Sequence, residues 1–218
     1  GNTISNIKLA KAIKNTVAVT AYKQSRLVNA CKKSILLQYP NSGIFTAGSI
    51  SFLASALTCI SLVSKVKIRN VSKLYKKAET QSRKIRLRGK VFLLGNLHTF
   101  PVAMFGAAKI YEAAGLDAHY ERIEQFSHMG LFSAKKRDTV IIFEGKNKYN
   151  SKLASNLKKY GLNIVQLQPN TKNIQETVLF FIFVSELIAL YNAKKKNQKD
   201  CFFVTAKKLR EASSSMIY

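Results

Sequence analysis

Apolar and polar positions alternate along the first half of the chain in a way that predicts helices and strands in turn. An amphipathic helix is expected over Ile4–Lys14, and short β-branched strands are expected over Thr16–Ala21 and Ser34–Gln38. A long helix of small and apolar residues, with few charges on any side, is expected over Thr46–Val63 and should be deeply buried. Strands that alternate with apolar helices predict an α/β layered architecture.

The second half carries a clearer pattern. Val91–Leu94 is an apolar run typical of a strand buried on both faces, and Gly95-Asn96 ends it. Pro101 suits the first position of a helix, and Gly115 suits the position after its last turn. A second buried strand is expected at Thr139–Phe143. Strand, turn, helix and strand form a βαβ unit.

The remaining apolar runs complete this layer. A helix is predicted over Ser151–Tyr160, a strand over Asn163–Leu167, a long buried helix over Ile174–Tyr191 and a short final helix over Ala206–Ser213. No uninterrupted apolar run reaches the roughly 20 residues that a membrane helix needs. With no recognisable signal peptide, we expect a cytoplasmic protein without a membrane partner.

Basic residues dominate the charge and divide the chain. The formal net charge is +25, from 36 Lys and Arg against 11 Asp and Glu. Lys and Arg are dense between Ser64 and Lys90, where Glu79 is the only acidic residue. Residues 65–90 are therefore predicted to form a basic connector helix between domains at 1–64 and 91–218. This balance favours anionic partners without choosing among them, and a solvated basic surface is the alternative.

The three cysteines, Cys31, Cys59 and Cys201, are scattered and have neither metal-site spacing nor a disulfide framework. No metal and no cofactor are expected.

Two motifs carry a family resemblance. G-N-L-H-T-F-P-V-A-M-F-G-A-A-K-I-Y-E (Gly95–Glu112), followed by E-Q-F-S-H-M-G (Glu124–Gly130), resembles the sugar isomerase (SIS) domain family, most of all the second SIS domain of glucosamine-6-phosphate synthase and archaeal phosphosugar isomerases. The resemblance implies a flavodoxin-like fold, a parallel sheet with helices on both faces. It also implies two tandem SIS units, the first incomplete at its N-terminus, because Gly1-Asn2-Thr3 looks like the end of a phosphate loop.

The same resemblance implies roles for particular residues. Glu112 falls at the base that moves a proton between adjacent sugar carbons, and His128 falls at the ring-opening histidine, which this family supplies to the neighbouring subunit of a homodimer. Lys207 resembles the lysine that covers the sugar site. The implied contacts to the sugar phosphate come from Gly1, Asn2, Thr3 and Ile44.

Three functions remain open at this point. The resemblance favours an enzyme, a phosphosugar aldose–ketose isomerase acting on a hexose or hexosamine phosphate, or a related deaminating isomerase. A non-catalytic, regulatory module that binds sugar phosphates is the alternative. Nucleic-acid binding rests on charge alone. No binding motif is recognised, and the basic connector lacks the aromatic interleaving that single-strand binders use, so a nucleic acid is not expected as a partner.

Overall fold

The computed structural model describes residues 4–40, 43 and 47–217, and it divides the chain into two compact units. The first unit comprises residues 1–66 with 204–218, and the second comprises residues 67–203. The predicted connector therefore falls largely in the second unit. There α4 (Val71–Ser82) buries Leu74 and Ala78 and packs against α8 (Ile174–Lys195).

The first unit is built around two short parallel strands, β1 (Val17–Thr20) and β2 (Lys33–Leu36). Helices α1 (Ile4–Ala12) and α2 (Arg26–Ala30) pack on one another beside them. Its further helices are α3 (Ile50–Val63) and α10 (Lys207–Ile217), and α9 (Phe202–Thr205) joins the units along the chain. These elements agree with the predicted strands and helices.

The expected deep burial of the helix ending at Val63 is wrong. No residue of α3 is buried, and its side chains are half-buried or exposed. A helix that is apolar all round is buried only where other elements cover every side. The residues described for the first unit do not provide that cover.

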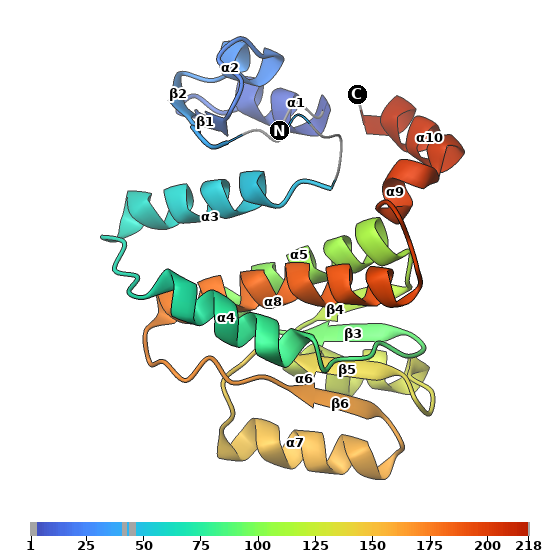
Figure 1. Cartoon of the computed structure of the whole chain (residues 1–218). Helices are drawn as coiled ribbons and strands as arrows, with labels where there is room; N and C mark the ends of the chain where they lie inside the picture. Colours follow the sequence, from blue (N-terminus) through green and yellow to red (C-terminus); the bar gives the residue numbers. More distant parts are fainter. Residues whose placement is uncertain (1–3, 41–42, 44–46, 218) are drawn as a thin grey trace. The chain divides into compact units, whose positions relative to one another are not determined.

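The second unit is a three-layer α/β domain (Figure 1). Its strands are β3 (Val91–Leu94), β4 (Ala118–Glu121), β5 (Thr139–Ile142) and β6 (Asn163–Gln166). They are all parallel and lie in the order β4-β3-β5-β6. The predicted βαβ unit is confirmed in outline, with β3 and β5 side by side. The strand β4 was not predicted, and it pairs on the other side of β3.

Helices cover both faces of this sheet. On one face α6 (Ile123–His128) and α7 (Lys148–Lys159) enclose a core that includes Phe92, Phe126 and Val140. On the other face lie α5 (Phe100–Lys109) and α8, where Gly106 approaches Leu93, Phe143 and Ser185 so closely that a side chain would clash. A π-helical turn, η2 (Ile110–Ala114), extends α5. Short 3₁₀ turns, η1 (Leu97–Thr99) and η3 (Gly130–Ser133), follow β3 and α6.

Helix α8 is long and apolar enough to span a membrane, but 61% of its most apolar window is buried within the protein. The alternation of buried strand and buried helix explains this composition, because α8 packs between α5 and α4 rather than facing solvent on all sides. The prediction of a buried helix beginning at Ile174 is confirmed.

Candidate active site

Glu112 lies in the π-helical turn η2, at the C-terminal end of α5. Such turns are rare, and they recur at functional sites because the extra residue redirects one side chain from the regular helical position. Gly115 ends the turn with φ of 59°, as predicted, and its N–H donates to the carbonyl of Tyr111. Glu112 therefore lies in a π-helical turn whose end is fixed by a backbone hydrogen bond.

A buried lysine holds the Glu112 carboxylate. Lys109 Nζ lies 2.5 Å from Glu112 Oε2, and the Lys109 side chain is only 6% exposed whereas that of Glu112 is 39% exposed. The ammonium also lies 5.3 Å from the centre of the Phe105 ring. Burying an ammonium is costly unless it is paired. Lys109 and Glu112 therefore form an ion pair, with the lysine inside and the carboxylate at the surface.

This arrangement suits proton transfer. The bond to Lys109 fixes the carboxylate through one oxygen, while Oε1 has no polar partner among the residues that the structure describes. An oriented, half-exposed carboxylate oxygen is what a general base presents to a substrate. Sequence reasoning missed Lys109. The signal was present, because two opposite charges stand three residues apart in an otherwise apolar helix.

His128 is the last residue of α6 and is exposed. It therefore lies at a helix end. Its imidazole has no polar partner among the described residues. An exposed, unpaired histidine is available to a group outside its own domain.

Glu121, at the end of β4, contacts the segment that follows His128. The Glu121 carboxylate accepts a hydrogen bond from the Gly130 backbone, and a Cβ added at Gly130 would overlap Oε1 and lie 2.7 Å from Oε2. Glu124 is exposed. Glycine at position 130 therefore lets the end of β4 hold the chain just beyond His128, a contact that no motif in the sequence indicated.

Burial raises the pKa of Glu121 above its usual value of 4.5, and the Gly130 hydrogen bond and His119 only partly oppose this effect. Its Oε2 is buried without a hydrogen-bond partner among the described residues. A raised pKa in the folded state means that the folded protein binds this proton more tightly than the unfolded chain does. The contribution of protonated Glu121 to the free energy of unfolding is therefore complete below pH 4.5. It is lost as pH rises through the pKa of Glu121 in the folded state.

We expect Glu121→Gln to raise the melting temperature at about pH 7.5 relative to the unsubstituted protein, with the gain shrinking towards about pH 4. The amide removes the buried charge and keeps an acceptor for Gly130. Thermal unfolding followed by circular dichroism at both pH values tests this. A gain of the same size at both would show that ionisation of Glu121 is not its cause.

In the turn after β3, the backbone and side-chain polar groups form hydrogen bonds within the protein. Asn96 N–H donates to Thr99 Oγ1 at 3.0 Å, Thr99 N–H donates back to the Asn96 carbonyl at 2.8 Å, and Asn96 Oδ1 accepts from Ile123 N–H at 3.3 Å. A Cβ at Gly95 would lie 2.6 Å from the Thr99 carbonyl oxygen. Because these donors are already used, the turn is better suited to joining β3 to α6 than to holding a phosphate.

The structure brings Glu112 close to Lys109 but not to His128. Helix α5 runs from the carboxyl end of β3 back to the amino end of β4, where the Tyr111 hydroxyl donates to Asp117 Oδ1 at 3.2 Å. His128 follows the carboxyl end of β4 after one short helix. The two residues therefore belong to opposite ends of the same strands.

The other predicted site residues lie outside this domain. Lys207 is the exposed first residue of α10 and belongs to the first unit. Gly1, Asn2, Thr3 and Ile44 lie outside the described residues.

Comparison with solved structures identifies the fold of the chain. No family model and no curated protein sequence matches the chain. Among solved structures, glucosamine-6-phosphate deaminase from Thermotoga maritima superposes with a TM-score of 0.69 at 15% identity, over 84% of this chain and 62% of that one. Tagatose-6-phosphate ketose/aldose isomerase from Escherichia coli gives 0.63 at 16% identity, over 84% and 60%.

The C-terminal domain of glucosamine-fructose-6-phosphate aminotransferase from Francisella tularensis gives a TM-score of 0.60 at 14% identity, over 86% of this chain and 65% of that one. The fold is that of the sugar isomerase domain. At these identities the likeness concerns the fold, and the chain spans about three fifths of the length of these proteins. The predicted fold class, a parallel α/β sheet flanked by helices, is confirmed.

Proposed function

We propose that the protein is a phosphosugar aldose–ketose isomerase in which Glu112 is the base. The observation that carries this proposal is the Lys109–Glu112 pair in a π-helical turn, within a fold otherwise seen in phosphosugar isomerases and deaminases. In the reaction, the Glu112 carboxylate removes the proton from C2 of the open-chain aldose phosphate. A proton passes from O2 to O1 of the resulting enediolate, and C1 takes back the proton that Glu112 removed, giving the ketose phosphate and restoring the carboxylate.

Lys109 is proposed as a positioning residue. It holds one carboxylate oxygen at 2.5 Å and leaves the other without a polar partner among the described residues. A base must lie within hydrogen-bond reach of the carbon-bound proton, so a carboxylate that rotated freely would be in the reactive position for less of the time.

His128 is proposed to open the sugar ring in the active site of a second copy of the chain. Its exposure and its place at the opposite end of the strands from Glu112 support a site shared between subunits of a homodimer. Following the family resemblance, Gly1, Asn2, Thr3 and Ile44 are proposed to bind the sugar phosphate, and Lys207 is proposed to cover it.

Mixing two inactive variants tests the shared site. Glu112→Gln and His128→Ala are each expected to lose isomerisation of fructose 6-phosphate. A mixed dimer has one site with both residues intact, so unfolding and refolding them together should restore up to about one quarter of the unsubstituted activity. If the mixture stays inactive although mass spectrometry detects mixed dimers, the two residues do not act in a shared site.

A non-catalytic sugar-phosphate-binding module is the second candidate. The separation of Glu112 from His128 within one chain is the observation that favours it. A binding module would be stabilised against heat by fructose 6-phosphate without exchanging the C1 protons of that sugar with solvent. Exchange of a C1 proton would exclude it.

A further inference from the structure

Cations gather at one edge of the second unit, the edge at which the parallel strands begin (Figure 1, right-hand end of the sheet). The segments that lead into β3, β5 and β6, together with the end of α8, are residues 83–90, 135–137, 158–159 and 194–199. They contain fourteen Lys and Arg and no acidic residue. Except for Lys90, all these cations are exposed.

Hydrogen bonds show that these segments are neighbours. Lys195 Nζ donates to the carbonyls of Arg83 at 3.3 Å and Ile85 at 2.9 Å, which joins the end of α8 to the segment that enters β3. Asn163 Nδ2 donates to the Arg86 carbonyl at 3.1 Å. The N–H of Arg137 donates to the carbonyl of Gly161 at 2.9 Å. The basic edge, as we call these four segments, is therefore one continuous surface.

Few carboxylates lie next to the basic edge. Asp117, just before β4, and Asp200, just after the last segment, are exposed, and Asp117 already contacts Tyr111 and His119. Asp138 is 5% exposed, and its two oxygens accept from the backbone N–H groups of Lys90 at 3.0 Å and Lys135 at 2.8 Å. One cation, Arg83, is paired with Glu79 at 2.7 Å. Most of the positive charge therefore faces solvent, where it attracts anions over about a Debye length.

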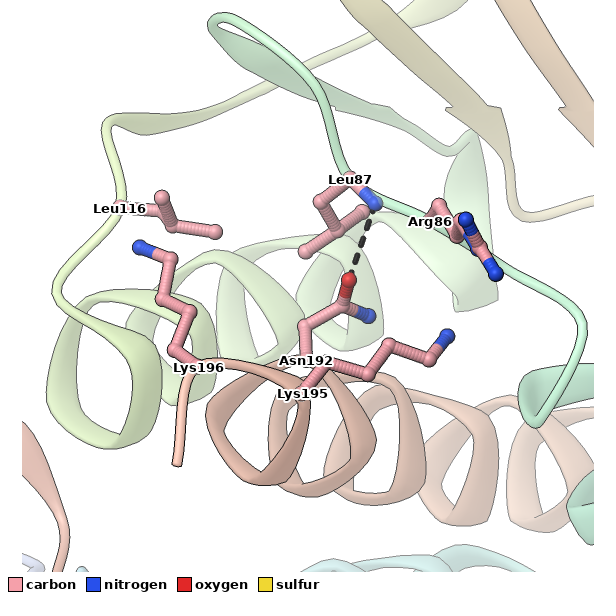
Figure 2. A pocket seen from close by; sticks show the side chains of 6 residues that line it. All are labelled: Arg86, Leu87, Leu116, Asn192, Lys195 and Lys196. Carbon is pink, nitrogen blue, oxygen red and sulfur yellow. Dashed lines mark hydrogen bonds between the residues drawn. The ribbon is translucent and has the colours of Figure 1, made fainter. Parts of the chain in front are cut away.

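A cavity of about 350 Å³ opens within this edge (Figure 2). It is lined by Arg86, Leu87, Leu116, Asn192, Lys195 and Lys196. Asn192 does not serve a ligand, because its Oδ1 accepts from Leu87 N–H at 3.0 Å and its amide donates to Ile188. The lining thus places three positive charges beside two leucines, which suits a phosphate with an apolar or aromatic group attached. The Lys195 ammonium also donates to backbone carbonyls, as described above, and that of Lys196 donates to the Ala114 carbonyl at 3.4 Å.

We propose that the basic edge binds the phosphate backbone of a nucleic acid, with one nucleotide seated in the cavity lined by Arg86 and Lys196. This interaction goes beyond the proposed isomerase activity. The number and spread of the cations exceed what one small phosphate ester needs, and they suit a chain of regularly spaced charges. Tyr160, 69% exposed beside Gly161, offers a ring on which a base can stack.

Neither helix dipoles nor a membrane surface accounts for the whole basic edge. Cations at helix C-termini offset the helix dipole, which fits Lys158 and Lys195, but the stretch 135–137 follows no α-helix. An anionic membrane also attracts cations, yet stable membrane binding needs exposed apolar anchors. Among the described residues of the four segments, no aliphatic or phenylalanine side chain is exposed.

Fluorescence anisotropy with labelled single-stranded and duplex RNA and DNA, each about 20 nucleotides long, tests this proposal on the full chain. The edge variant replaces Lys84, Arg86, Lys135 and Lys158 with Gln. The control variant removes the same charge far from the edge, by replacing Lys73, Lys76, Lys148 and Lys152 with Gln. All eight side chains are exposed. Lys73 and Lys76 lie on the half of α4 whose Lys77 bonds Pro169, beyond the carboxyl end of β6.

We expect the full chain to bind with an affinity that falls steeply with salt. The edge variant should bind at least about tenfold more weakly at about 50 mM salt, with a shallower salt dependence, while the control variant changes little. Equal losses in both variants would overturn the proposal, as would the absence of binding at that salt concentration. Tighter binding to phosphatidylserine vesicles than to the oligonucleotides would also overturn it and would assign the edge to membranes.

Discussion

Glu112→Gln is expected to lower the rate of C1 proton exchange of fructose 6-phosphate by about a hundredfold to ten-thousandfold, the usual contribution of a general base. The amide keeps the size of the side chain and still accepts from Lys109 at the same helix end, so the fold should be retained. Substrate binding should also be retained, because the lost function is proton transfer. Deuterium incorporation from solvent, followed by proton NMR, measures the rate.

Glu211→Gln is the matched control, since it removes a carboxylate of the same length from an exposed position on α10. Its exchange rate should equal that of the unsubstituted protein. If Glu112→Gln exchanges the proton as fast as this control does, Glu112 is not the base and the proposed mechanism is wrong.

Phe181→Ala is expected to destabilise the second unit by about 3–5 kcal/mol, the usual cost of truncating a buried phenylalanine. Phe181 is fully buried, stacks on Phe143 with ring centres 5.1 Å apart, and meets Phe180 edge-on at 5.2 Å. Its loss would open a cavity between α8 and the sheet. The melting temperature should fall by roughly 10 °C, as measured by calorimetry.

Phe132→Ala makes the same chemical change at a position that is 84% exposed, and it should leave the melting temperature nearly unchanged. Similar melting temperatures for both variants would mean that Phe181 does not lie in the core described for the second unit.

The fold of the second unit was largely predictable because its strands and helices are marked by strong local signals. The apolar runs at β3 and β5 and the glycine after η2 each indicate one conformation. The strand β4 carries no such signal. Its sequence, Ala-His-Tyr-Glu, has one buried side chain, and its strand conformation depends on pairing with β3.

The candidate site was predictable only in part. The motif around Glu112 was visible in sequence, but the π-helical turn and the burial of Lys109 depend on packing against neighbouring elements. The contact of Glu121 with Gly130 joins β4 to the turn after α6, and β4 itself was not predicted. The clustering of cations at one edge likewise follows from the parallel topology, which places segments far apart in the sequence side by side.

Proton exchange at C1 of fructose 6-phosphate in deuterated water, catalysed by the unsubstituted protein, is the most direct test of the proposed isomerase function. Enediolate formation at Glu112 predicts that deuterium appears in the sugar phosphate at a rate proportional to protein concentration, together with the aldose phosphate. Binding of the sugar phosphate without incorporation of deuterium, in protein shown to be folded and dimeric, would contradict it.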